Sequence, residues 1–149
     1  MKSLRTILTG AAIAALTVTA APFVAQATEV APPRPGGQGH AQVQADGRLY
    51  AYVNRNYDSA AGWCSWQGDS ADWGSCKNWT SSVWNNRYPG ALDFVWVHYN
   101  SNNQGARRGI YNGVALPDLR DWTFDAGTGA GSGQALDNNI ASHQVTNAP

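Results

Sequence analysis

The feature that most constrains this chain is an internal repeat of a strand–turn–strand unit. Residues 50–68 line up with residues 95–113, and a closing segment, 77–82 (KNWTSS), matches 138–143 (NNIASH). Repeated sequence units fold into repeated structural units. Two copies of roughly 45–50 residues, each with room for four short strands, therefore predict a pair of Greek-key motifs packed as a sandwich.

Composition also favours an all-β fold. After Ala27 the chain holds a single Lys and a single Glu, which are helix-favouring residues, whereas Asn, Gly, Tyr and Trp are frequent. The clearest strands are 49–53 and 94–99, each followed by an Asn-rich turn. Shorter strands are expected around 63–66, 81–84, 109–111 and 141–145. The second copy carries a longer insertion that includes Gly127–Gly133, which we interpret as a mobile loop.

The first 45 residues are unlike the repeated part. A positively charged start precedes an uncharged apolar run, and Ala25-Gln26-Ala27 fits the small-x-small pattern of a signal-peptidase site. We expect residues 1–27 to be a cleaved signal peptide and residues 28–45, rich in Pro and Gly, to be a flexible, disordered tether. The folded domain then spans residues 46–149, and the protein is expected to be secreted and extracellular.

Cys64 and Cys76 are the two cysteines of the chain. In an oxidising extracellular setting an even number of cysteines suggests a disulfide bond. The alternative is a metal site, but two cysteines without a nearby histidine make a poor zinc ligand set. We therefore expect a Cys64–Cys76 disulfide.

The charge balance excludes two classes of partner. All ten acidic residues but only eight of the ten basic ones follow Ala27, which leaves the exported chain close to neutral. Binding to nucleic acid or to an anionic membrane surface needs a basic surface. Neither partner is expected once the signal peptide has been removed.

Four motifs carry a resemblance to a known family: Tyr50-Ala51-Tyr52, Gly62–Gly68, Ser81–Asn86 and Asp137–His143. In this order they resemble the secreted bacterial peptidase-inhibitor family of the Streptomyces metalloproteinase inhibitor type. The paired Greek keys resemble the βγ-crystallin fold. The resemblance implies an all-β, βγ-crystallin-like sandwich that inhibits zinc proteases of the thermolysin kind.

An inhibitor of this kind would present one loop to the protease cleft in an extended, substrate-like shape. A loop that is already ordered loses little entropy on binding. The candidate loops are 55–62 and 100–109, although each could be an ordinary hairpin connection. The candidate inhibitory residues are Asn56, Tyr57, Asp58, Asn102, Asn103, Arg107 and Arg108. The expected partner is a secreted metalloprotease.

Calcium is the one cofactor that the resemblance suggests. In calcium-binding βγ-crystallins the closing segment carries Asn or Asp at its first two positions, then two variable residues, then Ser or Thr, and finally Ser, and such oxygen ligands suit a hard cation. Matching this motif gives the candidate ligands Asn78, Ser81, Asn139 and Ser142, while Lys77 stands at the opening position of the first copy. The alternative is that Asn and Ser simply close turns by hydrogen bonds to the backbone.

No catalytic pattern is found. His40, His98 and His143 lack metal-ligand spacing, and there is neither a Gly-x-Ser-x-Gly elbow nor a spaced pair of carboxylates, so we expect no enzyme. The seven Trp residues either pack the core or form a stacking surface. The rival functions are therefore a cell-envelope or carbohydrate-binding module and a calcium-binding structural protein.

Overall fold

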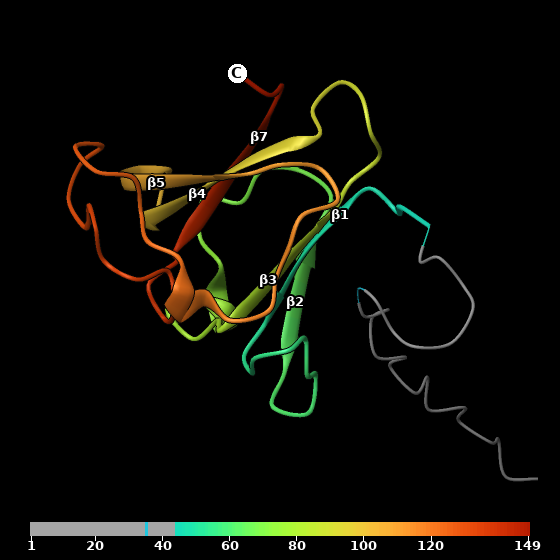
Figure 1. Ribbon diagram of the computed structural model, residues 1–149, viewed down its shortest axis with the longest axis horizontal. Coiled ribbons are helices and arrows are strands. Elements are labelled where there is room, and N and C mark those ends of the chain that lie inside the picture. Colours follow the sequence, from blue (N-terminus) through green and yellow to red (C-terminus); the bar gives the residue numbers. More distant parts are fainter. Residues whose placement is uncertain (1–34, 36–43) are drawn as a thin grey trace, which may run out of the picture. The chain divides into compact units, whose positions relative to one another are not determined.

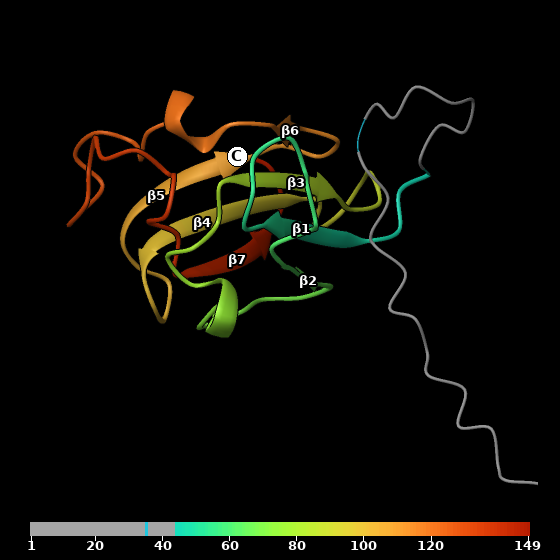
Figure 2. The ribbon, with the colours of Figure 1, turned by 90° about the horizontal axis from the view of Figure 1, so that it is seen from below.

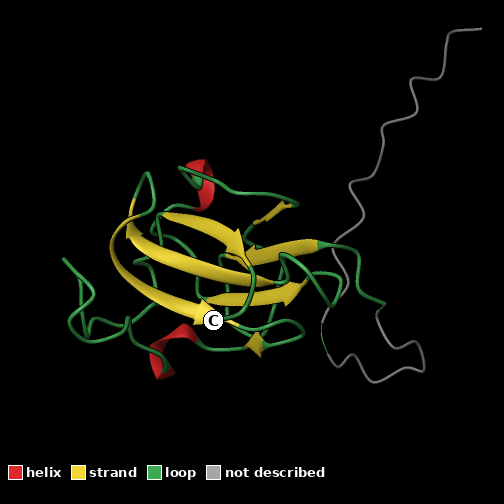
Figure 3. Ribbon diagram, turned by 90° about the horizontal axis from the view of Figure 1, so that it is seen from above, coloured by secondary structure: helices red, strands yellow, loops and turns green. Residues whose placement is uncertain are grey.

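The computed structural model describes Pro35 and residues 44–149. The predicted signal peptide and nearly all of the predicted tether therefore lie outside the described residues. The described chain forms the strands and short 3-10 turns β1 (Arg48–Tyr52), β2 (Trp63–Trp66), η1 (Gly74–Cys76), β3 (Ser82–Asn86), β4 (Phe94–Asn100), β5 (Gln104–Ile110), β6 (Ala115–Leu116), η2 (Leu119–Asp121) and β7 (Ser142–Thr146). Figure 3 shows strands and loops with these two short helical turns.

The strands form two antiparallel sheets, seen as separate layers in Figure 1. One sheet has the order β2-β1-β3-β6 and the other the order β5-β4-β7. The two halves of the chain exchange strands, because β6 from the second half pairs with β3 of the first. In return, Ser70 from the first half pairs with His143 of β7. The predicted all-β sandwich of two Greek keys is confirmed.

The core lies between the two sheets and follows the two-residue period of the strands. Leu49 and Ala51 of β1 pack with Val83 of β3 and with Val95 and Val97 of β4, and all five side chains are fully buried. Burying a side chain of the size of Val or Leu stabilises a fold by roughly 1.5–3 kcal/mol. The intervening residues of β1 face the other way.

The sequence alignment of the two copies is out of register by one residue. The backbone N–H of Tyr57 donates to Ser82 Oγ at 3.0 Å, and in the second copy the N–H of Asn103 donates to Ser142 Oγ at 3.0 Å. Ser82 is therefore equivalent to Ser142, whereas the sequence match paired Ser142 with Ser81. A slip of one residue exchanges the two faces of a strand, so only the structural register places equivalent residues on the same face.

The strand predicted at 109–111 is longer and begins earlier. β5 runs from Gln104 to Ile110 and pairs with β4 across a register shift between His98 and Asn100. The predicted loop 100–109 is therefore reduced to a tight turn. Arg107 and Arg108 lie in β5 and not in a loop, since their backbones pair with His98 and Val97 of β4.

The glycine-rich insertion, which was expected to be a mobile loop, is a loop that is packed against β5. In Figures 1 and 2 it lies beside the end of β5. The N–H of Ala106 donates to the carbonyl of Ala130 at 2.8 Å, and the N–H of Arg107 donates to Thr128 Oγ1 at 3.2 Å. A Cβ atom on Gly131 would lie 2.3 Å from the ring of Tyr99, so glycine is needed for this close approach.

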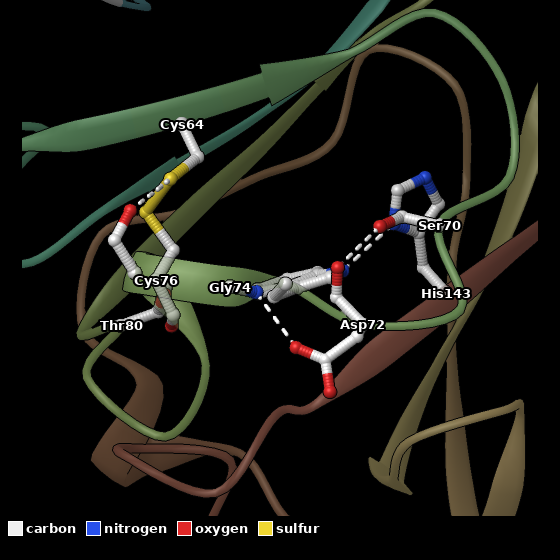
Figure 4. The surroundings of a disulfide bond; sticks show 9 residues. Cys64, Ser70, Asp72, Gly74, Cys76, Thr80 and His143 are labelled. Carbon is white, nitrogen blue, oxygen red and sulfur yellow. Dashed lines mark hydrogen bonds between the residues drawn. A yellow bond between two sulfur atoms is a disulfide. The ribbon is translucent and has the colours of Figure 1, made fainter.

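The predicted Cys64–Cys76 disulfide is confirmed, with a Cα–Cα distance of 6.3 Å. It ties β2 to η1, as Figure 4 shows. Closing a loop of this length is worth about 3 kcal/mol in the chain-entropy model. The bond therefore stabilises the part of the first copy that the strands leave irregular.

His143 of β7 is a buried, neutral hydrogen-bonding residue beside this disulfide region (Figure 4). Its Nδ1 accepts from Trp73 Nε1 at 2.8 Å, and its Nε2 donates to the carbonyl of Gly68 at 2.7 Å. Trp66 stacks on Trp73 with 4.7 Å between ring centroids. Burial lowers the pKa of His143 from 6.5 to about 4. Both ring nitrogens of His143 are therefore used in hydrogen bonds inside the fold.

We predict that acid weakens the fold through His143. Above pH 6.5 this residue is neutral in both the folded and the unfolded chain. Between pH 6.5 and about 4 the unfolded chain binds a proton that the native state does not, because the native pKa is the lower one. The free energy of unfolding should then fall as the pH falls, by about 3 kcal/mol in total. Urea unfolding at a series of pH values measures this slope.

The control is His143→Gln, whose amide can also accept one hydrogen bond and donate another but does not titrate in this range. Its unfolding free energy should depend less on pH between 6.5 and 4. The carboxyls of Asp72 and Asp118 titrate lower, since their pKa values lie near 2. The same pH slope in both proteins would contradict the role of His143.

Candidate functional site

The connection between β1 and β2, residues 53–62, projects beyond the sheets (Figure 1). Ser82 Oγ donates to the carbonyl of Asn54 at 2.7 Å and accepts from the N–H of Tyr57 at 3.0 Å. The N–H of Asn56 donates to the carbonyl of Pro117 at 2.8 Å. The loop is thus attached to β3 and to the segment that precedes η2.

Hydrogen bonds inside the loop give it a defined shape. Asp58 accepts from Asn54 Nδ2 at 2.9 Å and from the N–H of Ala60 at 3.0 Å. The N–H of Gly62 donates to the carbonyl of Ser59 at 3.1 Å. Ala60 and the adjacent Ala61 are exposed. The loop therefore has an ordered base and a narrow tip of small side chains.

The structure separates the roles of the three candidate residues in this loop. Tyr57 is only 9% exposed and packs edge-on against Tyr52, with ring centroids 5.8 Å apart, so it is not available to a partner. Burial raises the pKa of Tyr57 to about 12. Asn56 is exposed, and Asp58 holds the loop together. Asn56 and Tyr57 have φ values of 54° and 58°, so the expected extended shape is wrong at these two residues.

The turn between β4 and β5 repeats this geometry in fewer residues. Asn102 and Asn103 also have left-handed backbones, with φ values of 59° and 56°. The N–H of Asn102 donates to the carbonyl of Ala71 at 2.7 Å. Asn103 Oδ1 and both ring nitrogens of His98 are buried without a hydrogen-bond partner among the described residues. The turn is compact, and only Asn102 of the two candidates is exposed.

Arg107 and Arg108 contact different neighbours on β5. The guanidinium of Arg107 lies 4.3 Å from the ring centroid of Trp96, and its side chain is exposed. Arg108 donates to Asp125 Oδ1 at 3.2 Å and lies 5.2 Å from the ring centroid of Trp122. The seven candidate inhibitory residues therefore come from the β1–β2 loop, the β4–β5 turn and strand β5.

The two closing segments are hydrogen-bonded to one another. The N–H of Asn78 donates to the carbonyl of Ile140, and the N–H of Asn138 donates to the carbonyl of Thr80, both at 2.9 Å. Asn78 and Asn138 have φ values of 57° and 58°. Asn78 is therefore equivalent to Asn138, and Asn139 occupies the position of Trp79.

This register changes the candidate calcium ligands. The fully buried hydroxyl of Ser142 donates to the carbonyl of Asn100 at 2.6 Å and accepts from the N–H of Asn103, so it is already used inside the fold. The amide of Asn139 donates to the carbonyls of Ala135 and Asp137. Asn78 is exposed and Ser81 is 8% exposed.

In the corrected register, Asp137 stands at the opening position of the second closing segment and is equivalent to Lys77. The sequence match began at Asn138 and so did not include Asp137. Asp137 Oδ1 is buried and has no hydrogen-bond partner among the described residues. The N–H of Asp137 donates to the carbonyl of Leu119, whose own N–H donates to the carbonyl of Ser81. Asp137 and Ser81 therefore lie on either side of Leu119.

At the opening position of the first closing segment, the protein carries a positive charge of its own, that of Lys77. Lys77 Nζ lies 2.8 Å from Asp72 Oδ2, and Asp72 also accepts from the N–H of Gly74 at 2.8 Å and from Ser101 Oγ at 2.7 Å. These hydrogen bonds, chiefly the one from Lys77, lower the pKa of Asp72 to about 2. Lys77 is therefore part of an ion pair that neutralises this position.

Within the described part of the chain, no three His, Cys, Asp or Glu side chains are grouped so that they could hold a metal ion. The same residues contain no helix long and apolar enough to cross a membrane.

The tryptophans mostly support the core-packing interpretation. Trp73 and Trp84 are 2% and 5% exposed, and four others are partly buried. Trp79 is the exception at 66% exposed, and sequence reasoning missed it because composition does not distinguish an exposed Trp from a buried one.

No family model and no curated protein matches this chain. Solved structures do match it. One, from work on the evolution of the eye lens βγ-crystallin domain fold, aligns with a TM-score of 0.50 and 18% identity over 74% of this chain and 96% of its own. A βγ-crystallin from Ciona intestinalis aligns at 12% identity over 67% and 100% of the two chains, with a TM-score of 0.47. The first of these likenesses, together with the strand exchange described above, shows that the chain has a βγ-crystallin-like fold.

Proposed function

We propose that this domain is a secreted, non-enzymatic inhibitor of a zinc metalloprotease, and that the β1–β2 loop enters the protease cleft. The observation that carries the proposal is that this loop projects from the sheets and is already held by Ser82, Pro117 and Asp58. Order before binding reduces the entropy that is lost in the complex. The motifs that resemble the metalloproteinase-inhibitor family support the choice of partner.

The tip of the loop suits a narrow cleft. Ala60 and Ala61 are exposed and carry no side chain beyond Cβ, and Gly62 leads directly into β2. A backbone carbonyl from such a tip could take the open coordination position of a catalytic zinc ion. The disulfide at Cys64, two residues further on, holds the outgoing strand against η1.

The first test is Ala60→Asp. A carboxylate at the tip would be desolvated in the cleft, so we expect the inhibition constant to rise by roughly tenfold or more. The assay measures inhibition of several thermolysin-like proteases by the mature chain from Thr28. Thermal unfolding should change little, because Ala60 is exposed.

The matched control is Ala126→Asp, which adds the same charge at an exposed position of the loop that follows η2. It should inhibit as the parent chain does. An equal loss in both variants would contradict the placement of the site in the β1–β2 loop. Failure of the parent chain to inhibit any zinc protease at micromolar concentration would contradict the function itself.

The second candidate function is that of a calcium-binding, βγ-crystallin-like structural protein. The specific observation is the buried carboxylate oxygen of Asp137, which has no hydrogen-bond partner in the described part of the chain and lies near Ser81. Carboxylate, hydroxyl and carbonyl oxygens are the ligands that Ca²⁺ prefers. In the first closing segment the residue equivalent to Asp137 is Lys77, whose charge is paired with that of Asp72. We therefore propose at most one calcium ion per chain.

Isothermal calorimetry tests the stoichiometry and the ligand. We expect one binding event in the parent chain and a loss of affinity of roughly tenfold or more in Asp137→Asn, since ligand charge tunes calcium affinity. Lys77→Ala removes the internal cation at the other position and should leave the Asp137 event unchanged. No heat at millimolar calcium, or equal affinity in Asp137→Asn, would exclude this function.

A further inference from the structure

Strand β2 has one side that is free to pair. It is the edge strand of the first sheet and is hydrogen-bonded to β1 on its other side (Figure 1). The N–H of Val53 donates to the carbonyl of Gly62, so this pair and every second pair after it are the hydrogen-bonded ones of the ladder. The N–H and C=O groups of Trp63 and Ser65 therefore point away from β1. No described residue is hydrogen-bonded to these backbone groups.

The other edges of the two sheets are shorter or already hydrogen-bonded. β6 has two residues. The edge of β5 is covered by the insertion, whose residue Ala130 accepts from the N–H of Ala106. The edge of β7 is covered by Ser70, which exchanges two backbone hydrogen bonds with His143. β2 is thus the longest open edge in the part of the chain that the structure describes.

The sequence of β2 does nothing to close this edge. An exposed edge strand is a template for another strand, and proteins protect such edges with Lys, Pro or a β-bulge. β2 reads Trp-Cys-Ser-Trp, contains neither Lys nor Pro, and pairs with β1 without a shift of register. All four residues are partly exposed. The edge is therefore accessible to an extended backbone.

β2 is also held in place before any partner binds. Cys64 is joined to η1 by the disulfide, and Ser65 Oγ accepts from Arg48 Nη1 at 3.1 Å. Trp66 stacks on Trp73, as described above. A strand that is ordered in advance loses little entropy when it pairs with another.

We propose that an extended strand at the rim of the protease cleft pairs with the open edge of β2 and continues its sheet. The pairing rests on the function proposed above, since β2 begins two residues after Ala61 at the tip of the loop. A strand that adds to a sheet edge is held by main-chain hydrogen bonds. Ser65 lies four residues from Ala61, about 13 Å along an extended chain, so a protease that holds the tip also reaches the edge.

A protease fits this edge better than a second copy of the chain does. The edge offers the outward backbone groups of Trp63 and Ser65 and no more. A stable interface between two proteins buries about 1,200 Å² or more, which a strand of four residues does not supply by itself. In the complex with a protease the loop provides most of the contact, and the edge of β2 adds to it.

Amide hydrogen exchange of the mature chain from Thr28, free and bound to thermolysin, tests the pairing. The amides of Trp63 and Ser65 should exchange rapidly in the free chain and at least tenfold more slowly in the complex, because the protease strand then accepts from them. The amide of Cys64 points toward β1 and is the internal reference, with slow exchange in both states.

The outcomes separate the edge from the function. Inhibition without slower exchange of Trp63 and Ser65 overturns the pairing and leaves the proposed function in place. If the chain inhibits no zinc protease, the pairing falls together with that function. If both amides already exchange slowly in the free chain and exchange faster on tenfold dilution, a second copy occupies the edge, and the proposal is wrong.

Ser65→Pro tests the same edge by inhibition. Proline removes the outward N–H, which the ladder with β1 does not use, and prolines are tolerated at such positions of edge strands. Ser65→Ala is the matched control, because it also loses the hydrogen bond from Arg48 but keeps the N–H. We expect the inhibition constant of Ser65→Pro to exceed that of Ser65→Ala by about tenfold.

Equal inhibition constants in the two Ser65 variants would overturn the pairing. Thermal unfolding of both variants shows whether the proline disturbs the fold. If Ser65→Pro does not fold, the exchange of Trp63 and Ser65 in the parent chain still decides the question.

Discussion

Two buried serine hydroxyls hold the two halves of this domain in shape. Ser82 and Ser142 are fully buried, and each accepts a hydrogen bond from one backbone N–H and donates to one carbonyl of its own hairpin connection. A buried hydroxyl without such partners would destabilise the fold. The left-handed backbones of Asn56 and Asn102 are kept by this contact, and so is the shape of the loop that we propose to be inhibitory.

The halves depend on one another because each completes the other's sheet. β6 adds to the sheet that contains β1, and Ser70 pairs with His143 of the other sheet. The N–H of Asn78 also donates to Ile140 of the second half, and the N–H of Asn138 donates to Thr80 of the first. Neither Greek key can bury its apolar strand faces alone, so we expect the two to fold as one cooperative unit.

The same scaffold carries different side chains in its two copies. Trp79 stands where the second copy has Asn139, and Tyr57 stands where it has Asn103. The two copies share the hydrogen bonds that shape their backbones, but they carry different side chains on those backbones. Chemical asymmetry on a symmetric frame allows one half to serve for stability while the other presents a loop.

The sequence by itself determined the all-β class, the two repeated units and the Cys64–Cys76 bond, because composition, turn residues and cysteine count are local or global properties of the chain. Only the tertiary structure decided the register of the repeats. It assigned Ser142 to a buried hydrogen bond and Arg107 to a strand, and it brought Asp137 close to Ser81. These outcomes depend on contacts with residues far away along the chain. A short repeat can be aligned equally well with a shift of one residue, so its sequence alone does not show which residues are equivalent.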